Sequence, residues 1–252
     1  MTRVLSGIVL GAVALGAILF LPTLALRVAV CGVALLAARE YLAIVGAPSS
    51  VPVLALVVAA CWLVPDWRAE LALRLLGLVM AWVALTVLWR GTSVQTAGAQ
   101  ALAPLYLGLP LGMLLSVRDG AGPQTALLVI GTVVVSDSAQ YYSGRLFGRR
   151  PLAPSISPKK TQEGALGGLV FATLFVALVG PLFLARPVWS LAAVGAVAAA
   201  AGIAGDLFES RLKRAAGVKD SSTLIPGHGG VLDRIDALLF AAPVFYFYLQ
   251  AR

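Results

Sequence analysis

The chain has 252 residues, of which 60% are hydrophobic and only 12% are charged, and its mean hydropathy is +0.94. This composition excludes an ordinary soluble domain and is typical of a protein that crosses a membrane several times. The net charge of +8 suits contact with anionic lipid or phosphate, although the positive-inside bias of inner-membrane proteins produces the same excess.

Apolar windows separated by Pro, Gly or charged residues predict the membrane-spanning helices. They cover residues 4–21, 24–46, 51–65, 71–89, 98–117, 123–144, 164–184, 187–210 and 231–250. Pro104 and Pro110 should distort the fifth of these helices, and Cys31 and Cys61 are interpreted as small buried side chains. The predicted fold is all-α: a polytopic integral membrane helical bundle of about nine transmembrane helices, with residues 1–252 forming a single membrane domain.

Two connections carry most of the charge, Arg145 to Glu163 and Ser210 to Asp236. They are two predicted spans apart and therefore lie on the same side of the membrane. The positive-inside rule makes that side cytoplasmic. We therefore expect a multi-pass protein of a bacterial-type inner (plasma) membrane, with its functional site facing the cytoplasm.

The sixth window and the connection after it combine an acid with several bases. Asp137 lies within an apolar helix, so it should face the bundle interior with a basic side chain or a cation as its partner. Pro154 and Pro158 should stiffen a short loop that presents Lys159 and Lys160. With Ser155, Ser157 and Thr161 these lysines would make a phosphate-facing surface, and Thr161 can also cap the next helix. A structural ion pair at Asp137 and a simple membrane anchor at the lysines are the alternatives.

The eighth window ends in a polar helix face. Asp206, Glu209 or Ser210, and Lys213 recur at helical spacing, which suits a divalent cation held by carboxylate oxygens with bases above it for a polyphosphate.

A glycine-rich segment precedes the last window. Glycines flank His228, where backbone amides can approach phosphate closely, and Asp233 and Asp236 follow three residues apart as a second acidic face. The alternative for His228 is a hydrogen-bonded loop histidine.

These residues resemble the signature of the phosphatidate cytidylyltransferases, also called CDP-diacylglycerol synthases. Three blocks between residues 137 and 236 carry the resemblance, and the first 120 residues share only the pattern of apolar spans. Gln140 departs from the pattern, because the family usually has a small residue there. The matching residues are Asp137, Tyr141, Gly144, Arg145, Gly148 and the run from Ser157 to Gly164; the run from Gly205 to Ser210; and Leu212, Lys213, Arg214, Lys219, Asp220, Ser222, Ile225, Pro226, His228, Gly229, Gly230, Asp233, Arg234 and Asp236.

The resemblance implies a magnesium-dependent transfer of the cytidylyl group from CTP to phosphatidic acid, giving CDP-diacylglycerol and pyrophosphate in phospholipid biosynthesis. Residues 121–252 would carry the catalytic site, while the helices of 1–120 have no defined role. The implied catalytic residues are Asp206, Asp233, His228, Lys213, Arg214 and Lys219, and the implied substrate-binding residues are Arg145, Ser157, Lys159, Lys160, Thr161, Ser210, Gly229, Gly230 and Arg234.

Asp206 and Asp233 are the first choice as Mg²⁺ ligands, and Asp137 and Asp236 are the second. A second cation, monovalent or divalent, is left open. The resemblance also suggests a homodimer in the lipid bilayer, and we expect no nucleic-acid partner.

Three other functions compete with this prediction. A polyprenol or phytol kinase would also need acids and lysines at cytoplasmic helix ends. A transporter of an anionic solute is disfavoured because no inverted repeat is visible and the polar residues collect on one side. A CDP-alcohol phosphotransferase is disfavoured because its aspartate-rich helix motif is absent from the sequence.

Overall fold

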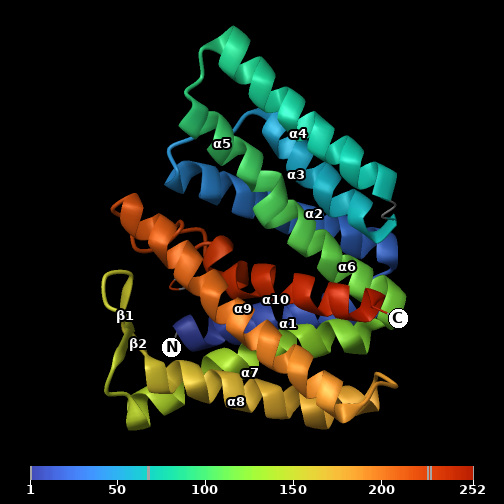
Figure 1. The fold of residues 1–252 in the computed structure, drawn as a ribbon, viewed down its shortest axis with the longest axis vertical. Helices are drawn as coiled ribbons and strands as arrows, with labels where there is room; N and C mark the ends of the chain where they lie inside the picture. Colours follow the sequence, from blue (N-terminus) through green and yellow to red (C-terminus); the bar gives the residue numbers. More distant parts are fainter. Residues whose placement is uncertain (1, 67–68, 226, 228, 252) are drawn as a thin grey trace. The chain divides into compact units, whose positions relative to one another are not determined.

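The structure, a computed structural model, describes residues 2–66, 69–225, 227 and 229–251. This part of the chain is almost entirely helical (Figure 1). Its elements are α1 (Thr2–Phe20), α2 (Thr23–Ile44), α3 (Val51–Leu63), η1 (Val64–Asp66), α4 (Ala69–Arg90), α5 (Val94–Ala103), η2 (Pro104–Gly108), α6 (Leu109–Ala121), α7 (Pro123–Phe147), β1 (Pro151–Ala153), β2 (Ser157–Thr161), α8 (Gln162–Val179), η3 (Gly180–Leu182), α9 (Val188–Ala215) and α10 (Leu232–Gln250).

The all-α prediction is confirmed, with α5, η2 and α6 forming one continuous helix in the fifth window. Within the described residues, three helices are long and apolar enough to cross a membrane: Val94–Ala121, Gln162–Leu182 and Val188–Ala215. Shorter apolar helices cover Gly11–Phe20, Val51–Leu63 and Arg74–Leu88. The total of about nine crossings stays a prediction.

The chain divides into two compact units, each described by itself. The first consists of Met1–Ser116 and Ala215–Arg234, and the second of Val117–Arg214 and Ile235–Arg252. This division leaves the prediction of a single membrane domain untested.

In the first unit, the predicted distortion of the fifth helix is a π-helical turn that begins at Pro104. A proline removes one backbone donor and crowds the preceding turn, which favours such a local widening. Gly108, in this wide turn, packs directly against the backbone of α3. A Cβ at this position would lie 2.5 Å from the carbonyl oxygen of Val57. From α2, the Tyr41 hydroxyl donates to the carbonyl oxygen of Ala99 at 3.1 Å.

In the second unit, α7 and α8 pack antiparallel through glycines of α8. A Cβ on Gly164 would lie 2.8 Å from the Gln140 carbonyl oxygen, and one on Gly168 would lie 3.0 Å from that of Ser136. Small residues at such an interface let two helices approach until their backbones touch. Gln140 is accommodated here because its Cγ lies over Gly168.

The segment after α7 differs from the predicted stiffened loop. It folds into an antiparallel hairpin of β1 and β2, in which Pro151 pairs with Thr161 and Ala153 with Ser157. The hairpin leads directly into α8, where the Thr161 hydroxyl oxygen accepts a hydrogen bond from the Gly164 N–H at 3.1 Å. The predicted helix cap is therefore confirmed.

Candidate functional site

Asp206, on α9, is the centre of the polar cluster in the second unit. Its Oδ2 atom forms an ion pair with the Lys160 ammonium group at the end of β2, and its Oδ1 atom accepts a hydrogen bond from the Ser210 hydroxyl at 3.3 Å. Both Lys160 and Asp206 are only about a quarter exposed, at 22% and 28%. The hairpin thus brings a predicted phosphate-binding lysine onto a predicted metal-binding aspartate.

Asp236, near the start of α10, extends the acidic part of this cluster. It lies close enough to Asp206 and to Asp137 for electrostatic repulsion, and close enough to Lys213 for attraction. Two carboxylates that repel each other favour a shared cation or a lysine between them. The oxygen donors of these aspartates are the kind that Mg²⁺ prefers.

Asp137, on α7, is exposed. Its Oδ1 atom accepts a hydrogen bond from the Gln140 side chain at 3.1 Å, and Gln140 also donates to Ser136 at 3.3 Å. Asp137 also lies close enough to Asp236 of α10 for electrostatic repulsion, so its predicted orientation towards the bundle interior stays a prediction.

The bases at the end of α9 have defined partners. The Lys213 ammonium group lies 2.5 Å from Oε2 of Glu209, which is completely buried. The Arg214 Nε atom donates to the carbonyl oxygen of Ile156 at 3.3 Å, which ties the end of α9 to the turn of the hairpin. On the predicted helix face, Asp206 pairs with Ser210 and Glu209 pairs with Lys213, and the two residues of each pair are one helical turn apart.

The first unit holds the other predicted metal ligand, Asp233. Its Oδ2 atom accepts hydrogen bonds from the Ser221 N–H at 2.9 Å, the Ser221 hydroxyl at 2.7 Å and the Gly230 N–H at 2.8 Å. These three donors converge on one carboxylate oxygen and fix its orientation. Gly229 has a φ of +79°, and a Cβ there would lie 2.5 Å from the same carboxylate oxygen, so a side chain would be strained and crowded.

Glu40, on α2, contacts the segment that carries Asp233, and the sequence interpretation did not include it. It is only 7% exposed, and its carboxylate accepts hydrogen bonds from Ser222 and from the backbone at the start of α10. A signal was available, because a charged residue in the middle of an apolar window is a functional candidate by default. It was overlooked because the other ionisable residues cluster in the second half of the chain.

The predicted site residues are divided between the two units. Lys219, Gly229, Gly230, Asp233 and Arg234 belong to the first; His228 lies outside the described residues. The second unit holds Asp137, Arg145, Ser157, Lys159, Lys160, Thr161, Asp206, Ser210, Lys213, Arg214 and Asp236. Among the described residues, no three acids, cysteines or histidines lie close enough together to hold a metal ion. The joint binding of Mg²⁺ by Asp206 and Asp233 stays a prediction.

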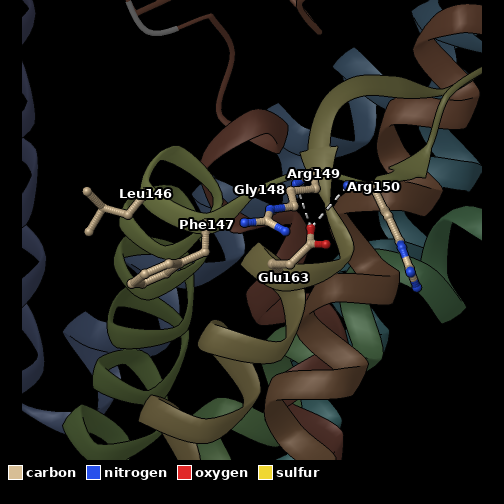
Figure 2. Close-up of a pocket in the computed structure, with 6 residues that line it drawn as sticks. All are labelled: Leu146, Phe147, Gly148, Arg149, Arg150 and Glu163. Carbon is tan, nitrogen blue, oxygen red and sulfur yellow. Dashed lines mark hydrogen bonds between the residues drawn. The ribbon is translucent and has the colours of Figure 1, made fainter.

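A separate cavity of about 400 Å³ lies at the end of α7 (Figure 2). Its lining residues are Leu146, Phe147, Gly148, Arg149, Arg150 and Glu163. The Glu163 carboxylate faces the backbone and accepts the N–H groups of Arg149 at 3.0 Å and Arg150 at 3.2 Å, while the Arg150 side chain extends away from it (Figure 2). Glu163 therefore fixes the chain where it leaves α7 for the hairpin.

Comparisons with known proteins agree with the sequence resemblance. The family model described as "Cytidylyltransferase family" matches residues 1–252. The phosphatidate cytidylyltransferase of Bacillus subtilis is 36% identical over 187 residues, which cover 72% of this chain and 68% of that protein. The phosphatidate cytidylyltransferase of Aquifex aeolicus is 40% identical over 146 residues, 58% of this chain and 54% of the relative.

An uncharacterized protein of Escherichia coli, YnbB, is also similar. It is 38% identical over 138 residues, which cover 55% of this chain and 46% of that protein. The chain spans about half the length of several of the curated relatives that it matches.

Proposed function

Because the chain belongs to the cytidylyltransferase family, we propose that it transfers the cytidylyl group from CTP to phosphatidic acid, giving CDP-diacylglycerol and pyrophosphate. The observation that carries this proposal is the Lys160–Asp206 pair. It joins a base suited to phosphate and an acid suited to a divalent cation, in a chain whose named relatives are phosphatidate cytidylyltransferases.

The reaction needs little proton transfer. A phosphate monoester has a second pKa near 6, so the phosphate of phosphatidic acid is largely a dianion at neutral pH. One of its oxygens attacks the α-phosphorus of CTP, and the bond from that phosphorus to the bridging oxygen breaks as pyrophosphate leaves. Catalysis then depends on positioning the two phosphates and on neutralising their charge.

The bases of the second unit supply positive charge for the substrates. Lys160 is held beside Asp206, and Arg214 is held against the turn of the hairpin, so both approach the cluster from defined directions. We assign Lys159, Lys160, Lys213 and Arg214, together with Lys219 of the first unit, to the CTP phosphates and the lipid headgroup. His228 is assigned to phosphate contact or leaving-group stabilisation.

Magnesium fits the donor chemistry of the acidic residues. Carboxylate oxygens are the usual protein ligands of Mg²⁺, and the repulsion between Asp236 and Asp206 would be relieved by a cation. We propose Asp206 and Asp233 as its ligands, with Asp137 and Asp236 as second choices and with room for a second cation. The bound ion would neutralise the CTP phosphates.

We also place the protein in a bacterial inner membrane, with about nine spans, a site that faces the cytoplasm and a homodimeric state. The long apolar helices and the short apolar helices support the multi-pass arrangement. The site requires such a location, because one substrate keeps its acyl chains in lipid while the other is a soluble, strongly anionic nucleotide.

The test is an assay of the purified protein in lipid with CTP, phosphatidic acid and Mg²⁺. We expect a lipid-soluble cytidine product with one pyrophosphate released per turnover, and none when Mg²⁺ is chelated. Asp206→Asn and Asp233→Asn should each lower kcat at least a hundredfold. Asp119→Asn, which changes an acid paired with Arg118 outside the site, is the matched control. No product from the intact protein, or full activity in both site variants, would overturn the proposal.

A further inference from the structure

Four donor groups of the segment that precedes and begins α10 surround the Glu40 carboxylate. Its Oε1 atom accepts hydrogen bonds from the Ser222 hydroxyl at 2.6 Å and the Val231 N–H at 3.1 Å. Its Oε2 atom accepts one from the Leu232 N–H at 2.7 Å and lies 3.2 Å from the Ser221 hydroxyl oxygen. Both carboxylate oxygens of Glu40 therefore accept hydrogen bonds from a segment that is more than 180 residues away in the sequence.

These contacts provide hydrogen-bond acceptors for backbone N–H groups at the start of α10. The first N–H groups of an α-helix have no partner within the helix, and a negative charge near them is favourable. Such a cap usually comes from a side chain in the same segment. Here α2 supplies it, so the start of α10 is fixed to a different helix of the first unit.

The backbone beside Glu40 has no room for another side chain. A Cβ on Gly230 would lie 2.5 Å from both Glu40 carboxylate oxygens and 2.1 Å from the Ser221 hydroxyl oxygen. A side chain at position 230 would therefore push the Glu40 carboxylate or the Ser221 hydroxyl out of its hydrogen bonds. Glu40 and Gly230 therefore form one closely fitted arrangement.

The same arrangement holds Asp233. The Ser221 hydroxyl lies 3.2 Å from Glu40 and 2.7 Å from Asp233, and it has a single proton to donate. The Gly230 N–H donates to Asp233, and the N–H of the next residue, Val231, donates to Glu40. A change at Glu40 therefore acts directly on the groups that orient the Asp233 carboxylate.

We propose that Glu40 is a positioning residue that fixes Ser221, Ser222 and the first turn of α10, and so holds the Asp233 carboxylate in its working orientation. The part of this inference that concerns activity rests on the proposed function, in which Asp233 is a magnesium ligand. Groups that hydrogen-bond to a metal ligand or its support commonly change metal affinity or activity by about 10–100-fold when mutated.

The experiment compares Glu40→Gln, Glu40→Asp and a control in the same unit, Gln100→Leu. Glutamine keeps the size of the side chain but replaces one acceptor by a donor group, which would face an N–H and a hydroxyl. Aspartate keeps both acceptors on a shorter side chain. The control removes the hydrogen bond from the buried Gln100 side chain to the Pro48 carbonyl oxygen at 2.9 Å, which destabilises the unit away from α10.

The first readout is hydrogen exchange without substrate or metal. The amides of Val231 and Leu232 should exchange at least tenfold faster in Glu40→Gln than in the unmodified protein, less so in Glu40→Asp, and unchanged in Gln100→Leu. Unchanged protection in Glu40→Gln would overturn the inference. If Glu40→Gln does not accumulate, Ser222→Ala, which removes the hydrogen bond from the Ser222 hydroxyl to Glu40, should still accelerate exchange at these amides.

The second readout is the Mg²⁺ dependence of turnover per folded molecule. Glu40→Gln should raise the Mg²⁺ concentration for half-maximal rate by about 10–100-fold, with partial recovery in Glu40→Asp. In Gln100→Leu, we expect a smaller amount of folded protein whose Mg²⁺ requirement is unchanged. If Glu40 had only a structural role, Glu40→Gln would behave in the same way. That result would overturn the inference. An inactive unmodified protein would instead refute the proposed function, while the exchange measurement would still test Glu40.

Discussion

Replacing Gly205 by alanine should push α9 away from α10 beside Asp206. A Cβ on Gly205 would lie 2.7 Å from the Asp236 carbonyl oxygen and 2.7 Å from Cδ2 of the Phe240 ring. The ring also lies against Phe208, with centroids 5.8 Å apart, so it cannot turn away without disturbing that contact. The two helices must therefore separate at the level of Asp206 and Asp236.

The magnitude follows from overpacking. An added methyl group in a tightly packed interior typically costs about 1–3 kcal/mol. A change of 1 kcal/mol shifts the melting temperature by roughly 2–4 °C in a chain of this size. We expect Gly205→Ala to melt about 2–12 °C lower. Because a displacement near 1 Å can cost about a hundredfold in rate, kcat should fall by more than the stability loss explains.

Gly202→Ala is the matched control for this prediction. Gly202 lies on the same helix, about one turn earlier, but a Cβ there would meet the Ala237 carbonyl oxygen at 3.5 Å and the Ala237 Cβ at 3.6 Å, which are ordinary contact distances. Both variants gain the same helix propensity, so their difference isolates the close contact. The measurements are thermal unfolding and turnover in lipid. Equal melting temperatures and equal kcat values for Gly205→Ala and Gly202→Ala would refute the reasoning.

Two further predictions concern the hairpin and the helix that follows it. Lys160→Ala removes the partner of Asp206 and a proposed phosphate contact, so the KM for CTP should rise about tenfold, equivalent to about 1.4 kcal/mol, in initial-rate measurements. Lys160→Arg should recover part of this loss, whereas an unchanged KM in Lys160→Ala would exclude the phosphate contact. Thr161→Val removes the acceptor for the Gly164 N–H and should lower the free energy of unfolding by about 1 kcal/mol in chemical denaturation. An undiminished stability would mean that the cap contributes nothing.

The helices could be predicted well because each apolar window is bounded by residues that end helices. The window at 123–144, for example, corresponds to α7, Pro123–Phe147, which begins at a proline and ends before Gly148. The hairpin could not be predicted in the same way. Its strands are short, with three and five residues, and Pro158 lies inside one of them. Its pairing depends on surrounding contacts, such as the hydrogen bond from Gln162 N–H to the Arg150 carbonyl oxygen at 2.9 Å.

The same distinction applies to the site. Neighbours within one helix follow from its period, which is why Asp206, Glu209 or Ser210, and Lys213 could be assigned to one helix face, where Asp206 pairs with Ser210 and Glu209 with Lys213. Contacts between distant segments do not follow from local spacing. Lys160 is 46 residues from Asp206, and Glu40 is 182 residues from Ser222. The contact between Glu40 of α2 and the start of α10 could therefore not be predicted from the sequence.

The two aspartates proposed as metal ligands are held by different kinds of partner. Asp206 is paired with the ammonium group of Lys160, a contact between charges that a cation and a phosphate could replace together. Asp233 is instead oriented by two backbone N–H groups and a hydroxyl, which converge on one of its carboxylate oxygens. One ligand is thus exchangeable and the other preorganised, and the preorganised ligand depends on Glu40. This difference is the reason to expect that Glu40, an acid on α2, affects the chemistry through Asp233.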